Sequence, residues 1–213
     1  MNMNLLSNKR YIFWDFDGVI KDSVEIKSNA YEDLFLQWGE LVSHKVRDHH
    51  RLNGGMSRFD KIPLYLSWTN ENVNEVLINK LCNDFSNLVK SKVINSPWVP
   101  GVIELINNLN SSGSDCFIVT ATPQDEIIEI LHELKLHSLF KDVIGAPTNK
   151  SDAIKLIIEK YKILKDNAVM FGDSKTDMIA ARNNNIDFIL RKTDENKVLQ
   201  ENLQYAMIDN FLL

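Results

Sequence analysis

The stretch YIFWDFDGVIKDS, residues 11–23, begins with an apolar run and then places Asp15, Asp17 and Asp22 close together around Gly18. Aromatic and aliphatic residues in such a run are typical of a buried strand. Removing carboxylates from water costs free energy unless a partner such as a metal ion compensates their charge. The stretch therefore predicts a buried strand that ends in acidic residues with a cationic partner.

Similar apolar runs recur along the chain, and amphipathic helical patterns separate most of them. After the first run at 11–16, further strands are expected at 116–120, 142–145, 167–171 and 186–190. Helices are expected at 102–110, 125–134, 152–161 and 177–184. Strands that alternate with helices predict an α/β fold with a Rossmann-like, three-layer parallel-sheet core wound by right-handed crossovers.

The gap between the first two strands is the exception, because nearly a hundred residues separate Phe16 from Cys116. Most of this gap has helical periodicity. We therefore expect an inserted helical domain at residues 23–97, within a core domain formed by residues 1–22 and 98–213. The insert is at the low end of independent domain size.

Composition limits the classes of function. With 44% hydrophobic and 25% charged residues the chain resembles an ordinary globular protein, and its apolar runs are too short for a membrane span. A formal net charge of -5 gives no general attraction to nucleic acid. The first residues lack the apolar core of a secretory signal, and Cys82 and Cys116 match no metal-binding spacing. Buried thiols and a cytoplasmic location are expected.

Polar residues cluster where the predicted strands end, which is the edge at which open α/β sheets bind ligands. The residues concerned are Asp15, Asp17, Thr120, Asp173 and Asp177, with Lys150 at the start of the helix after the third strand. Carboxylates suit a hard divalent cation, while a lysine and a hydroxyl suit an anion that the cation also touches. The pattern predicts a site for an anionic ligand and a divalent metal ion.

Four motifs carry a family resemblance. DFDGVIKDS (15–23), VTATP (119–123), Lys150 and GDSKTD (172–177), in this order, resemble the motifs of the haloacid dehalogenase superfamily. The insert resembles the helical cap of the phosphatase branch of that superfamily. The resemblance implies a Mg2+-dependent phosphomonoester hydrolase that acts on a small phosphorylated metabolite through an aspartyl phosphate. A phosphomutase of the β-phosphoglucomutase kind and a receiver-like phosphate-binding module stay open as alternatives.

The resemblance also implies a role for each matching residue. Asp15 would be the nucleophile, and Asp17 the general acid that protonates the leaving alcohol. An acid two residues after the nucleophile argues against the dehalogenase and phosphonate-hydrolase branches. The phosphoryl group would be bound by Thr120, Lys150 and backbone N–H groups around Phe16 and Ala121. Mg2+ would be held by the carboxylates of Asp15 and Asp173, the backbone carbonyl of Asp17 and, through water, Asp177.

The stretch HKVRDHHRLNGGMSRFDKIP, residues 44–63, is the most suggestive part of the insert. Its basic side chains are expected to bind a second anionic group of the substrate, and Arg51 and Arg58 are the chosen candidates. His44, His49 and His50 lack companions at a usual spacing, so a zinc site is not expected. A monomer or a small homo-oligomer is expected.

Two positions receive a structural interpretation. Asp22 and Ser23 are expected to cap the first helix of the insert rather than to act in the site. Asn185 stands where the family usually has a glycine after the helix that follows GDSKTD. Asparagine also tolerates left-handed backbone angles, so the turn is expected to be preserved.

Overall fold

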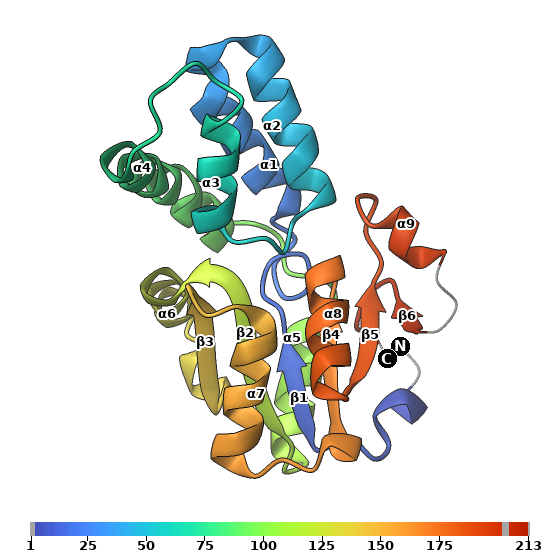
Figure 1. The fold of residues 1–213 in the computed structure, drawn as a ribbon. Helices are drawn as coiled ribbons and strands as arrows, with labels where there is room; N and C mark the ends of the chain where they lie inside the picture. The colour runs from blue at the N-terminus through green and yellow to red at the C-terminus, as the bar shows by residue number, and fades with distance from the viewer. Residues whose placement is uncertain (1–2, 202–204, 213) are drawn as a thin grey trace.

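The computed structural model describes residues 3–201 and 205–212. Within these residues the core contains a parallel sheet of six strands in the order β3-β2-β1-β4-β5-β6 (Figure 1). The strands are β1 (Tyr11–Trp14), β2 (Asp115–Pro123), β3 (Asp142–Ala146), β4 (Ala168–Gly172), β5 (Asp187–Arg191) and β6 (Ala206–Ile208). The chain order changes direction between β1 and β4, and this is the position where open α/β sheets place their ligands.

Helices cover both faces of the sheet, as the predicted three-layer core requires. The core helices are α5 (Val102–Ser111), α6 (Gln124–Glu133), α7 (Lys150–Tyr161), α8 (Lys175–Asn184) and α9 (Lys197–Gln200). Short 3-10 turns lie at Met3–Leu6, Leu36–Trp38, His137–Leu139 and Lys165–Asn167. Successive residues of β1 enter opposite layers: Ile12 and Trp14 belong to the cluster with α5 and α6, and Phe13 to the cluster with α7 and α8.

A helical insertion joins β1 to β2 and lies beyond the carboxyl edge of the sheet (Figure 1). We call it the cap; its helices are α1 (Val24–Phe35), α2 (Glu40–Leu52), α3 (Arg58–Leu66) and α4 (Glu75–Ile94). Its interior is aromatic: Tyr31 stacks on Phe85 with ring centroids 3.9 Å apart, and Tyr65 meets Tyr31 and Phe35 edge-on. The α/β class and the insertion are confirmed, while the proposed domain boundaries stay a prediction.

Most observed ends of strands and helices lie within two residues of the predicted ends, but β2 is longer than predicted, and α9 and β6 were not predicted. β2 continues to Pro123, three residues past the predicted end, with an irregularity in its pairing to β3 between Val119 and Pro123. β6 was not predicted, because three residues at the sheet edge carry too little pattern. Asn185 adopts the left-handed conformation at φ 54°, so it replaces the family's glycine as expected.

Cys82 and Cys116 are free and buried, as the sequence predicts. Among the described residues, no helix combines the length and the apolar character that crossing a bilayer requires.

Candidate active site

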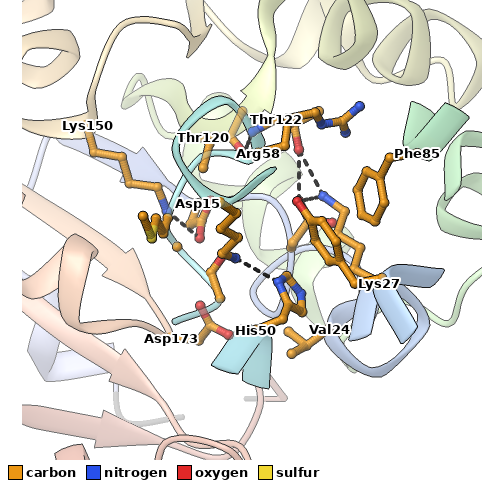
Figure 2. A pocket seen from close by; sticks show the side chains of 17 residues that line it. Asp15, Val24, Lys27, His50, Arg58, Phe85, Thr120, Thr122, Lys150 and Asp173 are labelled. Carbon is orange, nitrogen blue, oxygen red and sulfur yellow. Dashed lines mark hydrogen bonds and ion pairs between the residues drawn. The ribbon is translucent and has the colours of Figure 1, made fainter. Parts of the chain in front are cut away.

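Most of the predicted site residues line one pocket between the carboxyl edge of the sheet and the cap (Figure 2). The core wall contains Asp15, Asp17, Thr120, Ala121, Thr122, Lys150 and Asp173, and the cap wall contains Val24, Lys27, Tyr31, His50, Gly54, Gly55, Met56, Arg58, Lys61 and Phe85. The cavity between the walls measures about 40 Å³. At roughly 10–15 Å³ for each water, it holds only a few water molecules, so the cap lies closed on the core.

Three buried carboxylates lie together at the floor of the pocket, where Asp15 and Asp173 line the cavity and Asp177 lies beside them. Asp15, Asp173 and Asp177 each offer an oxygen, and these oxygens lie within 4.8 Å of one another. The Lys150 ammonium lies 2.7 Å from Asp15 Oδ2 and 2.6 Å from Asp177 Oδ1. Asp177 Oδ2 also accepts hydrogen bonds from the backbone N–H and the hydroxyl of Ser174, which completes the N-terminal cap of α8.

The charges on this floor do not balance. Burial and repulsion from Asp177 raise the pKa of Asp15 to about 7, although Lys150 opposes the rise. Burial and repulsion from Asp15 and Asp177 also raise the pKa of Asp173 well above its ordinary value. Burial alone would lower the pKa of Lys150, but Asp15 and Asp177 raise it. One ammonium thus faces three carboxylates, and oxygen ligands with excess negative charge fit a hard divalent cation.

Gly18 allows this floor to form. It has φ 78°, and a Cβ at this position would lie 2.1 Å from Oδ2 of Asp173. A side chain would therefore clash with the carboxylate even if the backbone strain were tolerated. The glycine after the two aspartates of the first motif lets the turn pass directly beside Asp173.

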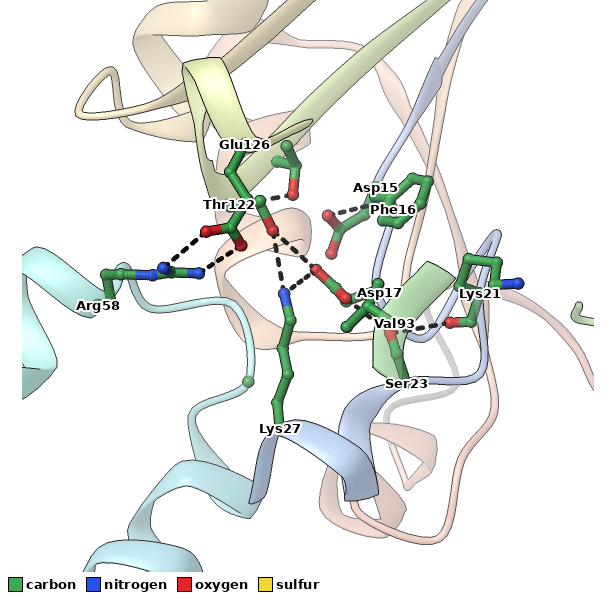
Figure 3. A network of polar contacts seen from close by, with 12 residues as sticks. Asp15, Phe16, Asp17, Lys21, Ser23, Lys27, Arg58, Val93, Thr122 and Glu126 are labelled. Atoms are coloured by element: carbon green, nitrogen blue, oxygen red, sulfur yellow. Dashed lines mark hydrogen bonds and ion pairs between the residues drawn. The ribbon is translucent and has the colours of Figure 1, made fainter. Parts of the chain in front are cut away.

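Asp17 is the centre of a second network, which joins the core to the cap (Figure 3). Ser23 Oγ donates to Asp17 Oδ1 at 2.6 Å, Thr122 Oγ1 donates to Oδ2 at 3.0 Å, and Lys27 Nζ forms an ion pair with Oδ2. Lys27 also donates to Thr122 Oγ1 at 3.0 Å. Burial would raise the pKa of Asp17, but Lys27 and the two hydroxyl donors lower it below its ordinary value.

The interpretation of Ser23 as a helix cap was therefore wrong. Ser23 occupies the N-cap position of α1, but its side chain makes no capping hydrogen bond and turns to Asp17 instead. The hydroxyl is instead oriented by a charge-assisted hydrogen bond to a carboxylate, which is stronger than a hydrogen bond between neutral groups. Asp22 lies outside the pocket, with Oδ1 3.5 Å from Arg191 Nη1.

The two arginines chosen from the insert have different positions. Arg51 lies outside the pocket and forms an exposed ion pair with Glu25, 2.5 Å from Nη2 to Oε1. The prediction that it contacts the substrate is not supported, because the last turn of α2 points this side chain toward α1. Arg58 lines the pocket, but its guanidinium is engaged: Nη1 and Nη2 donate to Glu126 at 2.8 and 2.7 Å. This buried pair joins α3 of the cap to α6 of the core.

Four further polar residues of the pocket were not among the chosen site residues, namely Lys27, His50, Lys61 and Thr122. His50 and Lys61 belong to the basic stretch 44–63, whereas Lys27 and Thr122 received no role. The sequence of α1 could have indicated Lys27, because Val24, Lys27 and Tyr31 share one buried helix face. A lysine on an apolar face is rarely buried unless it has a partner, so its position suggests a role in a site. His44, His49 and His50 face different partners, respectively Glu32, Tyr65 and Lys61.

Comparison with known proteins now decides the family. The family model for haloacid dehalogenase-like hydrolases matches residues 12–191. The chain belongs to this family. The match includes all four motifs and the cap, so this haloacid dehalogenase-like hydrolase contains both the floor and the lid of the pocket within the matched region.

Curated relatives of this haloacid dehalogenase-like hydrolase are phosphatases. A phosphorylated carbohydrates phosphatase of Thermotoga maritima is 24% identical over 210 residues, which cover 92% of this chain and 93% of that protein. A phosphoglycolate phosphatase of Vibrio parahaemolyticus is 29% identical over 185 residues, 82% of this chain and 79% of that protein. The β-phosphoglucomutase of Clostridium difficile has the same fold, with a TM-score of 0.78, 18% identity and coverage of 95% and 92%.

The first prediction concerns pH in the absence of metal. The raised pKa values of Asp15 and Asp173 mean that the folded protein retains protons which the unfolded chain releases near pH 3.8. Their contribution to the free energy of unfolding must fall as pH rises from about 4 through about 7. Relative to the wild type, Asp15→Asn should therefore gain stability with rising pH in chelator.

Denaturant unfolding of both proteins at several pH values measures this difference, and the comparison removes the opposite contribution of His50, whose pKa is lowered. Mg2+ should restore the stability of the wild type near pH 7, because the metal binds the ionised carboxylates and so stabilises the folded protein. A difference between the two proteins that is constant across the pH range in chelator would contradict the prediction.

The second prediction concerns the Arg58–Glu126 pair, whose side chains are only 4% and 7% exposed. Arg58→Met leaves the buried carboxylate of Glu126 without its charge partner, with the Ser86 hydroxyl still donating to it, and should cost about 3–5 kcal/mol, unless the cap opens to hydrate Glu126. The double variant Arg58→Met/Glu126→Leu should recover most of the loss. Denaturant unfolding and protease sensitivity of the cap measure the two responses.

Arg51→Met is the matched control, because the Arg51–Glu25 pair is half exposed and should contribute less than about 1 kcal/mol. Equal effects of Arg58→Met and Arg51→Met on stability and on protease sensitivity would contradict a role for Arg58 in joining cap and core.

Proposed function

We propose that this protein is a Mg2+-dependent phosphomonoesterase that hydrolyses a small phosphorylated metabolite through an aspartyl phosphate on Asp15. The chain is a phosphatase of the haloacid dehalogenase-like family, a phosphoric monoester hydrolase. The observation that carries the finer proposal is the placement of Asp15 and Asp17 in one closed pocket, each with its own lysine. The relatives named for phosphorylated carbohydrates and for phosphoglycolate support a small substrate.

The surroundings of Asp15 suit a nucleophile. Its Oδ1 accepts the N–H of Phe16 at 2.7 Å, which fixes the orientation of the carboxylate. In the first step a carboxylate oxygen of Asp15 forms a bond to phosphorus while the ester oxygen leaves. Asp17 gives a proton to that leaving oxygen, so that a neutral alcohol departs; because Lys27 lowers the pKa of Asp17, the carboxylate has to take up this proton before the step.

The second step regenerates the enzyme. A water molecule attacks the phosphorus of the aspartyl phosphate, and the Asp17 carboxylate takes a proton from this water. The bond between Asp15 and phosphorus breaks, which releases inorganic phosphate. The ion pair with Lys27 holds Asp17 in the ionised form that this step requires.

In this proposal Lys150 and Thr120 bind the phosphoryl oxygens. Lys150 lies beside Asp15 and is buried, so its charge is little screened by solvent. Thr120 Oγ1 accepts the N–H of Thr122 at 3.2 Å, which leaves its own hydrogen available for a phosphoryl oxygen. Ala121 follows Thr120 in the pocket wall, and its backbone N–H is the further donor of this proposal.

Asp15 and Asp173 would bind Mg2+ with their carboxylates, Asp17 with its backbone carbonyl, and Asp177 from further away, because its oxygens are already occupied by Lys150 and Ser174. Bound Mg2+ would neutralise the repulsion between the nucleophile and the phosphate. The excess of carboxylates over ammonium groups on the pocket floor supports this assignment.

The third prediction tests the proposed function. With Mg2+, the protein should release inorganic phosphate from small phosphomonoesters, and chelator should abolish the release. Asp15→Asn should lower turnover by more than about ten-thousandfold and Asp17→Asn by about 100- to 10,000-fold. Phosphate release from a panel of sugar phosphates, phosphoglycolate and nucleotides measures this.

Asp22→Asn is the matched control, because this acid follows the same strand but lies outside the pocket, and it should keep turnover within about twofold. Substantial Mg2+-dependent turnover by Asp15→Asn would refute the assignment of the nucleophile. Formation of an isomeric sugar phosphate without net phosphate release would instead identify the phosphomutase alternative.

The fourth prediction concerns Lys27. Loss of its ammonium should raise the pKa of Asp17, because the ion pair stabilises the carboxylate. In Lys27→Met the acid limb of the aspartyl-phosphate hydrolysis rate should therefore move to higher pH. Single-turnover kinetics across pH measure this limb. Thr122→Val removes only one hydroxyl donor and should shift the acid limb less. An acid limb that does not move in Lys27→Met would exclude the role of Lys27.

A further inference from the structure

The basic side chains that line the pocket differ in their partners. Lys27 is paired with Asp17, Arg58 with Glu126, and Lys150 with Asp15. Among the described residues, no carboxylate lies within ion-pair distance of the fourth cation, Lys61. The pocket therefore contains one basic group whose charge the protein itself does not neutralise.

Lys61 is as deeply buried as the catalytic lysine. Its side chain extends from α3 into the pocket and the residue is 1% exposed. Its Nζ lies 2.7 Å from His50 Nδ1 and 3.3 Å from the carbonyl oxygen of Gly54. Both partners are neutral acceptors, because burial and the neighbouring cations hold the pKa of His50 well below its ordinary value. An ammonium has three hydrogen atoms to donate, so one is left for a ligand.

An ammonium buried without a counter-charge is unfavourable, and folding alone gives no reason to keep it. Burial and the positive charges of Lys27 and Lys150 accordingly hold the pKa of Lys61 well below its ordinary value. A methionine of similar length would fill the same volume without this cost. An anion that enters the pocket would remove the cost.

We infer that Lys61 binds a second anionic group of the substrate, a carboxylate carried by a small phosphomonoester whose phosphoryl group lies against Asp15. This inference rests on the proposed function, since it assigns the far end of the same substrate. His50 and Gly54 orient the ammonium, and Lys61 takes the place that the sequence had suggested for Arg51 and Arg58. Arg51 is outside the pocket, and the guanidinium of Arg58 is occupied by Glu126.

Charge favours a carboxylate over a second phosphate. Lys27, Arg58 and Lys150 already have carboxylate partners, so Lys61 is the one lining cation of the described pocket residues left for a ligand. A carboxylate carries one negative charge and matches it, whereas a phosphate carries about -1.5 to -2 at pH 7. The substrate class is therefore a small phosphorylated carboxylic acid.

Calorimetric titration of the full chain with Mg2+ tests the inference without turnover. The probes are 3-phosphonopropionate and propylphosphonate, which have carbon bonded to phosphorus and differ only in the carboxylate. The wild type should bind 3-phosphonopropionate at least about tenfold more tightly, since a charge-assisted contact in a buried site has this magnitude. Equal affinities for the two probes would overturn the inference.

Lys61→Met should reduce the preference to less than about twofold while it leaves the affinity for propylphosphonate within about threefold. Lys61→Gln, which keeps a hydrogen-bond donor, is the second variant in case the methionine protein does not fold. Arg51→Met is the control that should retain the full preference. A preference that persists in both Lys61 variants would overturn the inference. A bisphosphonate of equal length that binds more tightly than 3-phosphonopropionate would overturn the choice of carboxylate.

Turnover of phosphoglycolate and 2-hydroxyethyl phosphate separates this inference from the proposed function. A protein that shows the binding preference but hydrolyses neither ester with Mg2+ would refute the phosphatase and support the anion site at Lys61. A protein that hydrolyses both esters equally and shows no binding preference would support the phosphatase and refute the anion site.

Discussion

The structure around the pocket depends on one electrostatic constraint, namely that Asp15, Asp173 and Asp177 are buried together with a single lysine between them. Like charges at this distance repel strongly where solvent does not screen them. The surrounding chain accommodates them by specific means: Gly18 gives Asp173 its space, and Ser174 saturates Asp177. Burying these acids together lowers the stability of the folded protein. Groups that lower stability in this way are typical of functional sites, and here the acids fit a divalent cation.

Much of the core was predictable from the sequence, because short stretches of sequence are enough to identify its strands and the polar residues that follow them. Asp15, Thr120 and Asp173 each follow a recognisable strand, and parallel topology brings strand ends to one edge whatever the loops between them do. The edge strand β6 and the extension of β2 to Pro123 were missed, since pairing with a neighbour rather than the pattern of their own residues creates them.

The cap was predictable in kind but not in detail. Helical periodicity predicts its helices, yet which of several basic residues reaches the pocket depends on how those helices pack. Arg51 leaves the last turn of α2 toward Glu25 of α1, outside the pocket, whereas Lys27 and Lys61 lie on the same helix faces as Tyr31 and Tyr65. The position of a lysine on an apolar helix face could have identified both residues. The number of basic residues in the insert does not reveal this position.

The Arg58–Glu126 pair connects positions 68 residues apart, one in the cap and one in the core. Each half is a liability without the other, because a buried charge left alone destabilises the protein that carries it. Caps are therefore not freely interchangeable parts within this architecture. A foreign cap placed on this core would need a basic residue where Arg58 stands, so that Glu126 keeps its partner. The core residue Glu126 therefore limits which caps, and which substrate specificities, this core can accept.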